Sequence, residues 1–287
     1  ILATLLLLNP AAQCAGDEPA PDSELAQYYG FTGVEITKLH ERAEHLKSGD
    51  FNGDGLTDVA VMDNFTSSIR LLLQRPPGTG AEKPGSRVNE LSSDKRFEDR
   101  RITMDRAIAE LETGDFDADG RQDFAVIGPP DQLAVYYQPE AGRKDWTKKW
   151  TVRLPGLEPV SGILAAGDFN GDGRLDLAAA GKSSMFLLFQ TEQGTLRAPE
   201  TLISTSGRQG LLQAADLNGD GRSDVLFQNS NGQAAIYFMN GTSVSSVSLA
   251  GGNPGASWAV RGSGDFNGDG KSDVLWQNSN GQIAFYL

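Results

Sequence analysis

Short apolar segments alternate with polar loops along most of this chain, and one combination of the two recurs five times. An apolar segment such as 163–166 leads into a loop rich in Asp and Gly, and a second apolar run such as 225–227 leaves it. The second runs are apolar at successive positions, which is typical of strands covered on both faces. We find no helical period between them, so the pattern predicts an all-β protein built from repeats.

Each repeat continues with two further strand patterns. A turn follows the second run, most clearly at 229–232 and 278–281, where Asn-Gly favours a tight primed turn. A third strand is expected at positions such as 68–73, and a more polar fourth strand at positions such as 150–154. Four short antiparallel strands per repeat predict the four-stranded blades of a β-propeller, with five repeats visible.

The loop between the first two strands is the most constant part of each repeat. It carries an oxygen-bearing side chain at positions one, three, five and nine, and Gly at position six. The five loops begin at Asp50, Asp115, Asp168, Asp216 and Asp265, which gives spacings of 65, 53, 48 and 49 residues. Short acidic side chains at alternate positions of a tight loop converge on one point, where a hard cation offsets their repulsion.

The predicted metal ligands are the side chains at positions one, three, five and nine, with the backbone carbonyl of position seven. They are Asp50, Asn52, Asp54, Leu56 and Asp58; Asp115, Asp117, Asp119, Arg121 and Asp123; Asp168, Asn170, Asp172, Arg174 and Asp176; Asp216, Asn218, Asp220, Arg222 and Asp224; and Asp265, Asn267, Asp269, Lys271 and Asp273. Such oxygen donors suit Ca²⁺, about one per repeat, better than Mg²⁺, which resists dehydration. Three carboxylates per loop, plus Asp117 in the second, predict dissociation constants of order 10⁻⁴ to 10⁻³ M and a mainly structural ion.

An EF-hand shares the start of this loop but requires Glu at position twelve and a helix on each side. Here position twelve is Val61, Val126, Ala179, Phe227 or Trp276, and a strand is expected where the second helix would begin. The EF-hand and dockerin-type interpretations therefore fail.

The pattern Asp-x-Asn-x-Asp-Gly-x-x-Asp followed by an apolar strand resembles the FG-GAP/VCBS repeat of integrin α-subunit propellers and exported bacterial proteins, over about 46–287. The resemblance implies a β-propeller with calcium loops between the first and second strands of each blade and, more loosely, extracellular adhesion or ligand binding. Ala118 replaces Gly in the second loop, and Leu217 replaces Phe in the fourth. The Phe-Gly and Gly-Ala-Pro landmarks of the integrin form are not recognisable, so the bacterial form is closer.

The expected domain organisation has three parts. Residues 1–15 resemble a signal peptide, 16–45 form a leader in which 37–45 allow a helical turn, and 46–287 form the propeller, with blades starting near 46, 108, 162, 211 and 258. Pro and Gly predict an inserted surface loop over 75–95. The last repeat stops within its third strand, so either 31–36 supplies the missing strand or further blades follow, and we favour truncation.

The first residues predict export. An apolar stretch, 1–8, precedes small residues at 11–15, as at a secretory cleavage site, and is too short to span a bilayer. Cys14 is a weaker candidate for lipid attachment, because Gln13 is bulky for the preceding position. We expect a secreted or cell-surface protein, with a periplasmic location as an alternative.

The formal net charge of −13 is local to the loops. They hold sixteen Asp, and without them the rest of the chain carries about +3. No basic stripe emerges from this accounting, so nucleic acid is not expected as a partner.

The sequence contains no recognisable catalytic group. Cys14 lies in the leader, His40 and His45 precede the first loop and are expected at the surface, and no Gly-x-Ser-x-Gly motif occurs. We therefore expect no enzyme in this region, but a calcium-binding scaffold for extracellular interaction or adhesion, with a protein or glycan as partner. The alternative is a carbohydrate-binding accessory module of a secreted polysaccharide-active enzyme whose catalytic domain is missing. For that alternative, four tryptophans could stack on sugar rings or instead pack between blades: Trp146, Trp150, Trp258 and Trp276.

Overall fold

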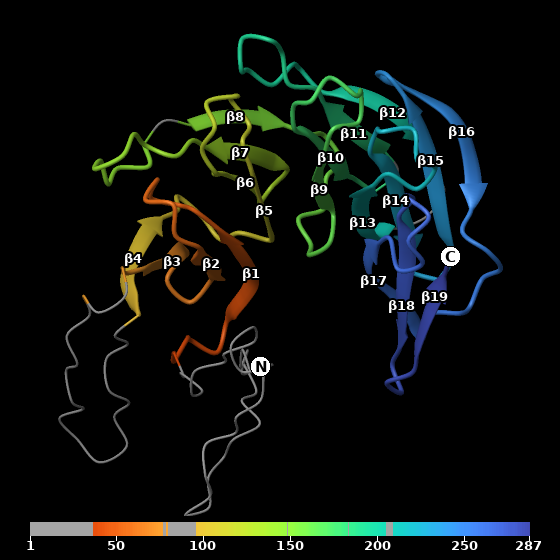
Figure 1. The fold of residues 1–287 in the computed structure, drawn as a ribbon, viewed down its shortest axis with the longest axis horizontal. Helices are drawn as coiled ribbons and strands as arrows, with labels where there is room; N and C mark the ends of the chain where they lie inside the picture. Colours follow the sequence, from red (N-terminus) through yellow and green to blue (C-terminus); the bar gives the residue numbers. More distant parts are fainter. Residues whose placement is uncertain (1–36, 77–78, 80–95, 148, 183, 205–208) are drawn as a thin grey trace, which may run out of the picture.

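The computed structural model describes residues 37–76, 79, 96–147, 149–182, 184–204 and 209–287. This part of the chain folds into strands and turns, with five antiparallel sheets that follow one another in an open arc (Figure 1). The predicted signal segment 1–15, the possible closing strand 31–36 and nearly all of the predicted insertion 75–95 lie outside the described residues.

Each sheet is one blade, and its strands pair in chain order. The first blade contains β1 (Ala43–Gly49), β2 (Asp58–Asp63), β3 (Ser68–Gln74) and β4 (Phe97–Thr103). The second contains β5 (Glu110–Gly114), β6 (Asp123–Gly128), β7 (Gln132–Tyr136) and β8 (Lys149–Arg153). The third contains β9 (Leu164–Gly167), β10 (Asp176–Ala180), β11 (Ser184–Leu188) and β12 (Glu200–Ser204). The fourth contains β13 (Gln209–Ala215), β14 (Asp224–Asn229), β15 (Ala234–Asn240) and β16 (Ser243–Leu249), and the fifth contains β17 (Trp258–Gly264), β18 (Asp273–Asn278) and β19 (Ile283–Tyr286).

The predicted fold class is confirmed: the described chain is all-β and consists of blades with the propeller arrangement of strands. The apolar runs that leave the loops form β2, β6, β10, β14 and β18, the second strands of the blades. Every residue of β6 and of β10 is buried, because neighbouring blades cover both faces of these strands. The more polar fourth strands, such as β8 and β16, lie at the outer edges.

Two local patterns fold differently from what the sequence suggests. Residues 37–45 form no helical turn, because Ala43 to His45 already belong to β1. The hairpins at 229–232 and 278–281 form, but not with primed turns. In the first of them, Gly232 N–H donates to Asn229 C=O over 2.9 Å, and Gly232 takes φ 95° while Asn231 keeps a negative φ. Three loop residues, with Gly in the left-handed conformation, form a bulged hairpin in place of the two-residue turn.

The hydrophobic core lies between blades. The first strands of successive blades neighbour one another, β1 beside β5, β5 beside β9, β9 beside β13 and β13 beside β17. Apolar clusters join the first blade to the second, the second through the fourth, and the fourth to the fifth. At one junction the rings of Phe51 and Phe124 lie 4.8 Å apart, centroid to centroid, and the ring of Trp146 lies 4.7 Å from Phe124 on another side. Each blade thus depends on its neighbours for burial of its apolar face.

Candidate metal sites

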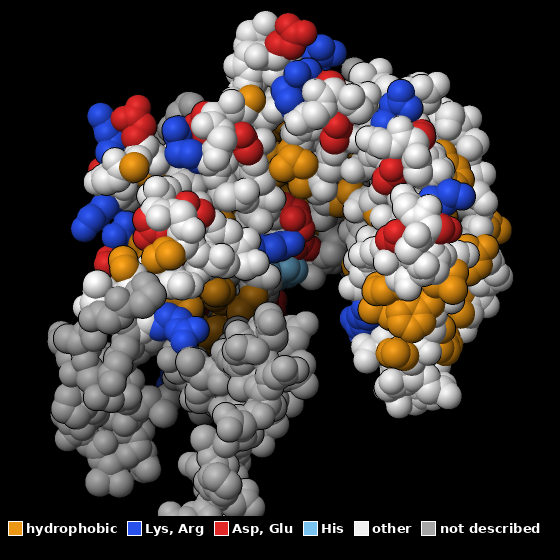
Figure 2. All heavy atoms as spheres, viewed as in Figure 1, with side chains coloured by type: hydrophobic (Ala, Val, Ile, Leu, Met, Phe, Trp, Pro, Cys, Tyr) orange, Lys and Arg blue, Asp and Glu red, His pale blue; other side chains and the backbone are white. Residues whose placement is uncertain are grey.

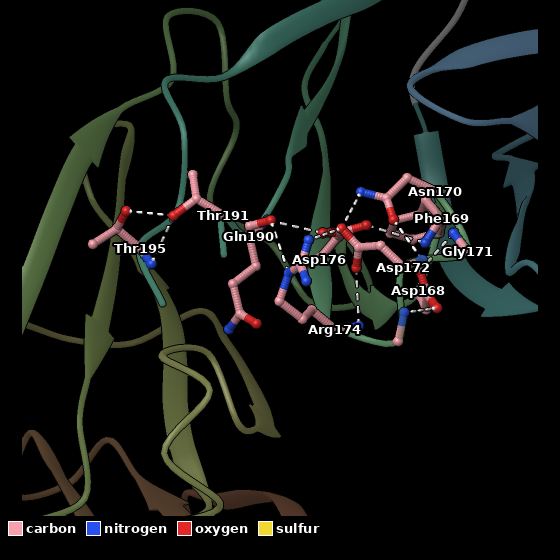
Figure 3. Close-up of polar contacts among 11 residues, drawn as sticks. Asp168, Phe169, Asn170, Gly171, Asp172, Arg174, Asp176, Gln190, Thr191 and Thr195 are labelled. Carbon is pink, nitrogen blue, oxygen red and sulfur yellow. Dashed lines mark hydrogen bonds and ion pairs between the residues drawn. The ribbon is translucent and has the colours of Figure 1, made fainter. Parts of the chain in front are cut away.

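The five acidic loops occupy equivalent places in the fold. Each connects the first strand of a blade to the second, as the third does between β9 and β10. The third loop shows how the predicted ligands are held (Figure 3).

The first aspartate of the loop organises the turn. Asp168 Oδ1 accepts hydrogen bonds from the N–H groups of Gly171 (2.7 Å) and Asp172 (3.0 Å), and Oδ2 accepts one from Gly173 N–H (2.8 Å). Gly171 and Gly173 have φ of 75° and 80°, a left-handed conformation that favours glycine. The same contacts to positions five and six recur from the first aspartate of the other four loops.

Positions three and five lie beside this aspartate. Asn170 Oδ1 accepts from Asp172 N–H over 2.9 Å, and Asn170 Nδ2 donates to Asp172 Oδ2 over 2.9 Å (Figure 3). Asp172 Oδ1 in turn accepts from Arg174 N–H over 3.0 Å. The side chains of positions three and five therefore contact each other, while that of position one binds the backbone of the same turn. Among the described residues, only the second loop brings three carboxylates within 4.8 Å of one another.

The ninth position has a second task that the sequence did not reveal. Asp176 is buried, and its two carboxylate oxygens accept hydrogen bonds from Phe169 N–H (3.1 Å) and Gln190 N–H (2.8 Å). Phe169 is position two of the same loop, and Gln190 follows β11. Asp176 thereby ties the loop to the end of the third strand. Asp58, Asp123 and Asp224 make the same two kinds of contact in the first, second and fourth loops.

Burial sets the electrostatics of this position. Desolvation raises the pKa of Asp123 and of Asp176 to about 7, and that of Asp58 and of Asp224 to about 6, against the opposing effect of the backbone hydrogen bonds. Nearby loop carboxylates raise these pKa values further: those at positions one and five act on Asp58, Asp176 and Asp224, and those at positions three and five act on Asp123. A bound cation would remove this penalty, and each oxygen that accepts one N–H retains a lone pair for coordination.

The seventh position contributes more than the backbone carbonyl that we predicted from the sequence. Arg174 forms an ion pair with Asp172, Arg121 forms one with Asp119, and Arg222 Nη1 lies 3.4 Å from Asp220 Oδ2. An arginine two residues after the fifth-position aspartate is the sequence feature that could have predicted these pairs. The guanidinium offsets part of the negative charge of the loop.

The second loop has the densest negative charge. Carboxylate oxygens of Asp115, Asp117 and Asp123 all lie within 4.8 Å of one another. Ala118, which replaces Gly, adopts φ 58°. The loop thus keeps its left-handed backbone with Ala in place of Gly, at a cost of roughly 1–2 kcal/mol. The pKa of Asp119 is raised, first by burial and then by its hydrogen bond to Asp117.

Neighbouring loops contact one another. Ser223 N–H, from the fourth loop, donates to Asp168 C=O of the third over 2.7 Å, and Ser272 N–H of the fifth donates to Asp216 C=O of the fourth over 2.7 Å. Gln190 Nε2 donates to Asp115 C=O of the second loop over 3.1 Å. These bonds place the third ligand set next to the fourth and the fourth next to the fifth, and they tie the second loop to the third blade.

The four tryptophans pack in or against the hydrophobic core. Trp146 and Trp276 are buried, and Trp150 and Trp258 pack against core clusters, so all four serve packing.

His40 Nδ1 lies 2.6 Å from Asp63 Oδ2 at the surface, as expected. The expectation for His45 is wrong: its side chain is only 16% exposed, and Nδ1 lies 2.8 Å from Glu110 Oε1 of the next blade.

Comparison with known proteins agrees with this architecture. A family model described as an FG-GAP-like repeat matches residues 115–179, 168–227 and 216–276, more than half of the chain. Each matched segment begins at the first aspartate of one loop and ends just beyond the following loop. The comparison with curated proteins found no match.

Solved structures match the chain at low identity. An Agrocybe aegerita lectin that recognises non-reducing terminal N-acetylglucosamine shares the fold and is 16% identical, with a TM-score of 0.55 over 82% of this chain and 61% of the lectin chain. The present chain therefore spans less than two thirds of that lectin. BBS1N in complex with ARL6DN is 12% identical, with a TM-score of 0.45 over 89% of this chain and 83% of that one. In the described part of this chain, no helix is long and apolar enough to cross a membrane.

Proposed function

This chain belongs to the FG-GAP-like repeat family, and we propose that it is a calcium-stabilised scaffold that binds an extracellular protein or glycan. The loops are the part of the molecule on which the proposal rests. In this function they serve binding and stability and need no catalytic group.

The observation that carries the proposal is the convergence of oxygen donors in the second loop, where Asp115, Asp117 and Asp123 lie within 4.8 Å of one another. Carboxylate and amide oxygens in this number are the donor set of Ca²⁺, which accepts six to eight oxygens in a flexible geometry. Neither thiolate nor imidazole is present in the five loops, so zinc and copper are disfavoured.

A calcium ion in these loops would act on the fold. The ninth-position aspartate links the loop to the third strand, as Asp176 links Phe169 to Gln190. A cation that neutralises this buried carboxylate would stabilise the junction of three strands. We therefore propose a structural ion in each loop, held by the residues at positions one, three, five and nine.

The proposed location follows from the affinity. Loops with three carboxylates are expected to bind calcium with dissociation constants of order 10⁻⁴ to 10⁻³ M. Such sites fill at extracellular calcium concentrations and stay largely empty in a cytosol. Together with the signal-like segment 1–15, this supports a secreted or cell-surface protein.

The lectin with the same fold supports a second candidate, a glycan-binding module attached to a polysaccharide-active enzyme. The packed positions of Trp146 and Trp276 speak against sugar stacking on those two rings. A glycan array and a panel of matrix proteins, both probed in calcium and in EDTA, distinguish the two candidates.

The decisive test of the calcium role is calorimetric titration combined with thermal melting. We expect calcium to bind with several sites per chain and to raise the melting temperature, and EDTA to lower it. Asp145→Asn, at an exposed aspartate outside the loops, is the control and should leave both measurements unchanged. A melting temperature that is the same in calcium and in EDTA contradicts the proposal.

A further inference from the structure

The inner strands of the blades surround an open pocket of about 420 Å³. Its polar lining includes His45, Glu110, Glu112 and Ser161, and its apolar lining includes Leu164 and Leu212. Figure 2 shows acidic side chains beside a histidine in the hollow of the arc. The acidic loops contribute none of the residues that line this pocket, so it is separate from the candidate metal sites.

Three side chains in the pocket form a continuous hydrogen-bonded relay. Ser161 Oγ lies 3.1 Å from His45 Nε2, and His45 Nδ1 lies 2.8 Å from Glu110 Oε1. They come from different places in the sequence, His45 from β1, Glu110 from β5 and Ser161 from the connection between β8 and β9. The order hydroxyl, imidazole, carboxylate is the arrangement by which proteins activate a serine.

The carboxylate end of the relay is buried and fixed. Glu110 is 3% exposed, and Oε1 also accepts from Leu111 N–H over 3.1 Å, while Oε2 accepts from Gly162 N–H. An ionised carboxylate can only accept, so His45 Nδ1 carries the hydrogen and Nε2 is left to accept one from the Ser161 hydroxyl. The hydrogen bond to Glu110 raises the pKa of His45 despite the opposing effect of burial, which favours uptake of a proton by the imidazole.

The backbone at His45 is specialised. It has φ 50°, an uncommon conformation for a residue other than glycine, and it lies at a bulge in the pairing of β1 with β2 between Glu44 and Leu46. Bulges redirect a side chain, and left-handed non-glycine residues cluster at functional sites. The first strands of the fourth and fifth blades also carry a bulge, so the left-handed φ, and not the bulge, distinguishes His45. Ser161, at the other end of the relay, is exposed to solvent.

We propose that Ser161 is the nucleophile of an acyl-transfer site, with His45 as its general base and Glu110 as the residue that positions His45. This activity goes beyond the scaffold function and does not depend on it. The substrate class is a carboxylic ester with a short acyl group, because the pocket is small and its apolar side consists of leucine and alanine side chains. β9 is the edge strand of its blade and lines the pocket, so we expect N–H groups on its free edge to face the ester carbonyl oxygen.

The chemistry balances without a cofactor. Ser161 Oγ forms a bond to the ester carbonyl carbon while its proton passes to His45 Nε2. The bond from that carbon to the alcohol oxygen then breaks, and the alcohol leaves with the proton from His45. Water next attacks the acyl-serine and gives its proton to His45, the bond from the carbon to Ser161 Oγ breaks, and Oγ recovers the proton. Nothing is oxidised or reduced.

The test is labelling of the intact chain with a fluorophosphonate probe in calcium-containing buffer, followed by peptide mapping with mass spectrometry. We expect one adduct per chain, on Ser161. Ser161→Ala should abolish the adduct, and His45→Gln should slow labelling by about 100-fold, the lower range for loss of a general base. Ser246→Ala, at an exposed serine of β16 outside the pocket, should label at the wild-type rate.

Hydrolysis of p-nitrophenyl acetate supplies a second measurement. We expect a burst of nitrophenol from the wild-type protein that is absent from Ser161→Ala. Labelling of the wild-type protein requires no substitution, so the test holds even where His45→Gln fails to fold. The proposal is overturned if Ser161 of the folded wild-type protein carries no adduct, or if a folded His45→Gln protein labels at the wild-type rate.

Discussion

Two aspartates of the third loop, both predicted metal ligands, should respond differently to the same substitution. Asp176 is buried, and its two oxygens accept the N–H groups of Phe169 and Gln190. Asp172 is exposed, accepts Arg174 N–H and forms an ion pair with the Arg174 guanidinium. Replacement of each by asparagine preserves shape while it removes one carboxylate.

The expected losses of stability without calcium follow from these contacts. In Asp176→Asn an NH₂ group faces one of the two buried N–H donors, and a buried donor without an acceptor costs about 1–3 kcal/mol. In Asp172→Asn the amide oxygen still accepts Arg174 N–H, and loss of an ion pair near the surface costs about 0–1 kcal/mol. In EDTA near pH 8, however, the wild-type Asp176 carboxyl, with its pKa of about 7, is ionised and carries a desolvation penalty that asparagine lacks. Each unit by which the pKa is raised corresponds to about 1.4 kcal/mol, and the whole rise exceeds the loss of one acceptor, so Asp176→Asn should be the more stable variant under these conditions.

Calcium should change this comparison. A site with a dissociation constant of order 10⁻⁴ to 10⁻³ M contributes about 1.4–2.7 kcal/mol in about 10 mM Ca²⁺ by mass action. Both variants should lose the stabilisation that calcium in the third loop contributes. Asp172→Asn is therefore expected to show a clear defect only when calcium is present.

The assay is urea unfolding followed by tryptophan fluorescence, with each variant measured in EDTA and in calcium beside the wild type and Asp145→Asn. Equal stability of the two variants in EDTA near pH 8 would refute the buried, desolvated position assigned to Asp176. A defect of Asp172→Asn that is as large in EDTA as in calcium would refute its role as a ligand.

Three further outcomes are expected. In EDTA the protein should melt at a higher temperature near pH 5 than near pH 8. Burial raises the pKa of the ninth-position aspartates to about 6 or 7, so near pH 5 the folded state binds protons that the unfolded state releases. This stabilisation is lost as the pH rises through those pKa values. Saturating calcium should reverse the slope, and melts that do not depend on pH in EDTA would contradict the reasoning. Asp117→Asn should weaken calcium binding to the second loop roughly fivefold, because one carboxylate at contact distance contributes about 1 kcal/mol in water; terbium luminescence titration measures this, and an unchanged affinity would exclude Asp117 as a ligand. Gly194→Ala should lower the melting temperature by more than Gly142→Ala. A Cβ at Gly194 would meet the Asp117 carbonyl oxygen at 1.8 Å, whereas Gly142, which also has a positive φ, has open space around it. Equal losses would show that the close approach is absent in solution.

Much of the fold was predictable because its causes are local. The second strands are covered on both faces, so their apolar runs stand out, and the loop motif repeats because each turn needs the same cap from its first aspartate. Asp168, for example, binds three N–H groups within five residues. The strands and their order were therefore expected correctly. The resemblance to FG-GAP repeats was confirmed for the same reason, since it depends on a pattern within one loop and strand.

The hairpin turns show where local patterns were insufficient. Asn231-Gly232 predicted a two-residue primed turn. In the structure, Asn229 N–H donates a hydrogen bond to Gln233 C=O over 2.8 Å, so three residues remain in the loop. Register depends on how β14 and β15 pack in the blade, and a dipeptide preference does not determine it.

The sequence by itself determined the repeat unit, its strands and the oxygen donors of each loop, because contacts between near neighbours produce all three. Only the tertiary structure decided that Asp176 holds the end of the third strand and that His45, Glu110 and Ser161 form one relay. The relay joins residues of the first two blades and of the connection to the third, up to 116 positions apart, and it exists because β1, β5 and the connection to β9 converge on one pocket. Two strand residues and one residue of a connection share no spacing that a periodic pattern could reveal, so the stacking of blades had to bring them together.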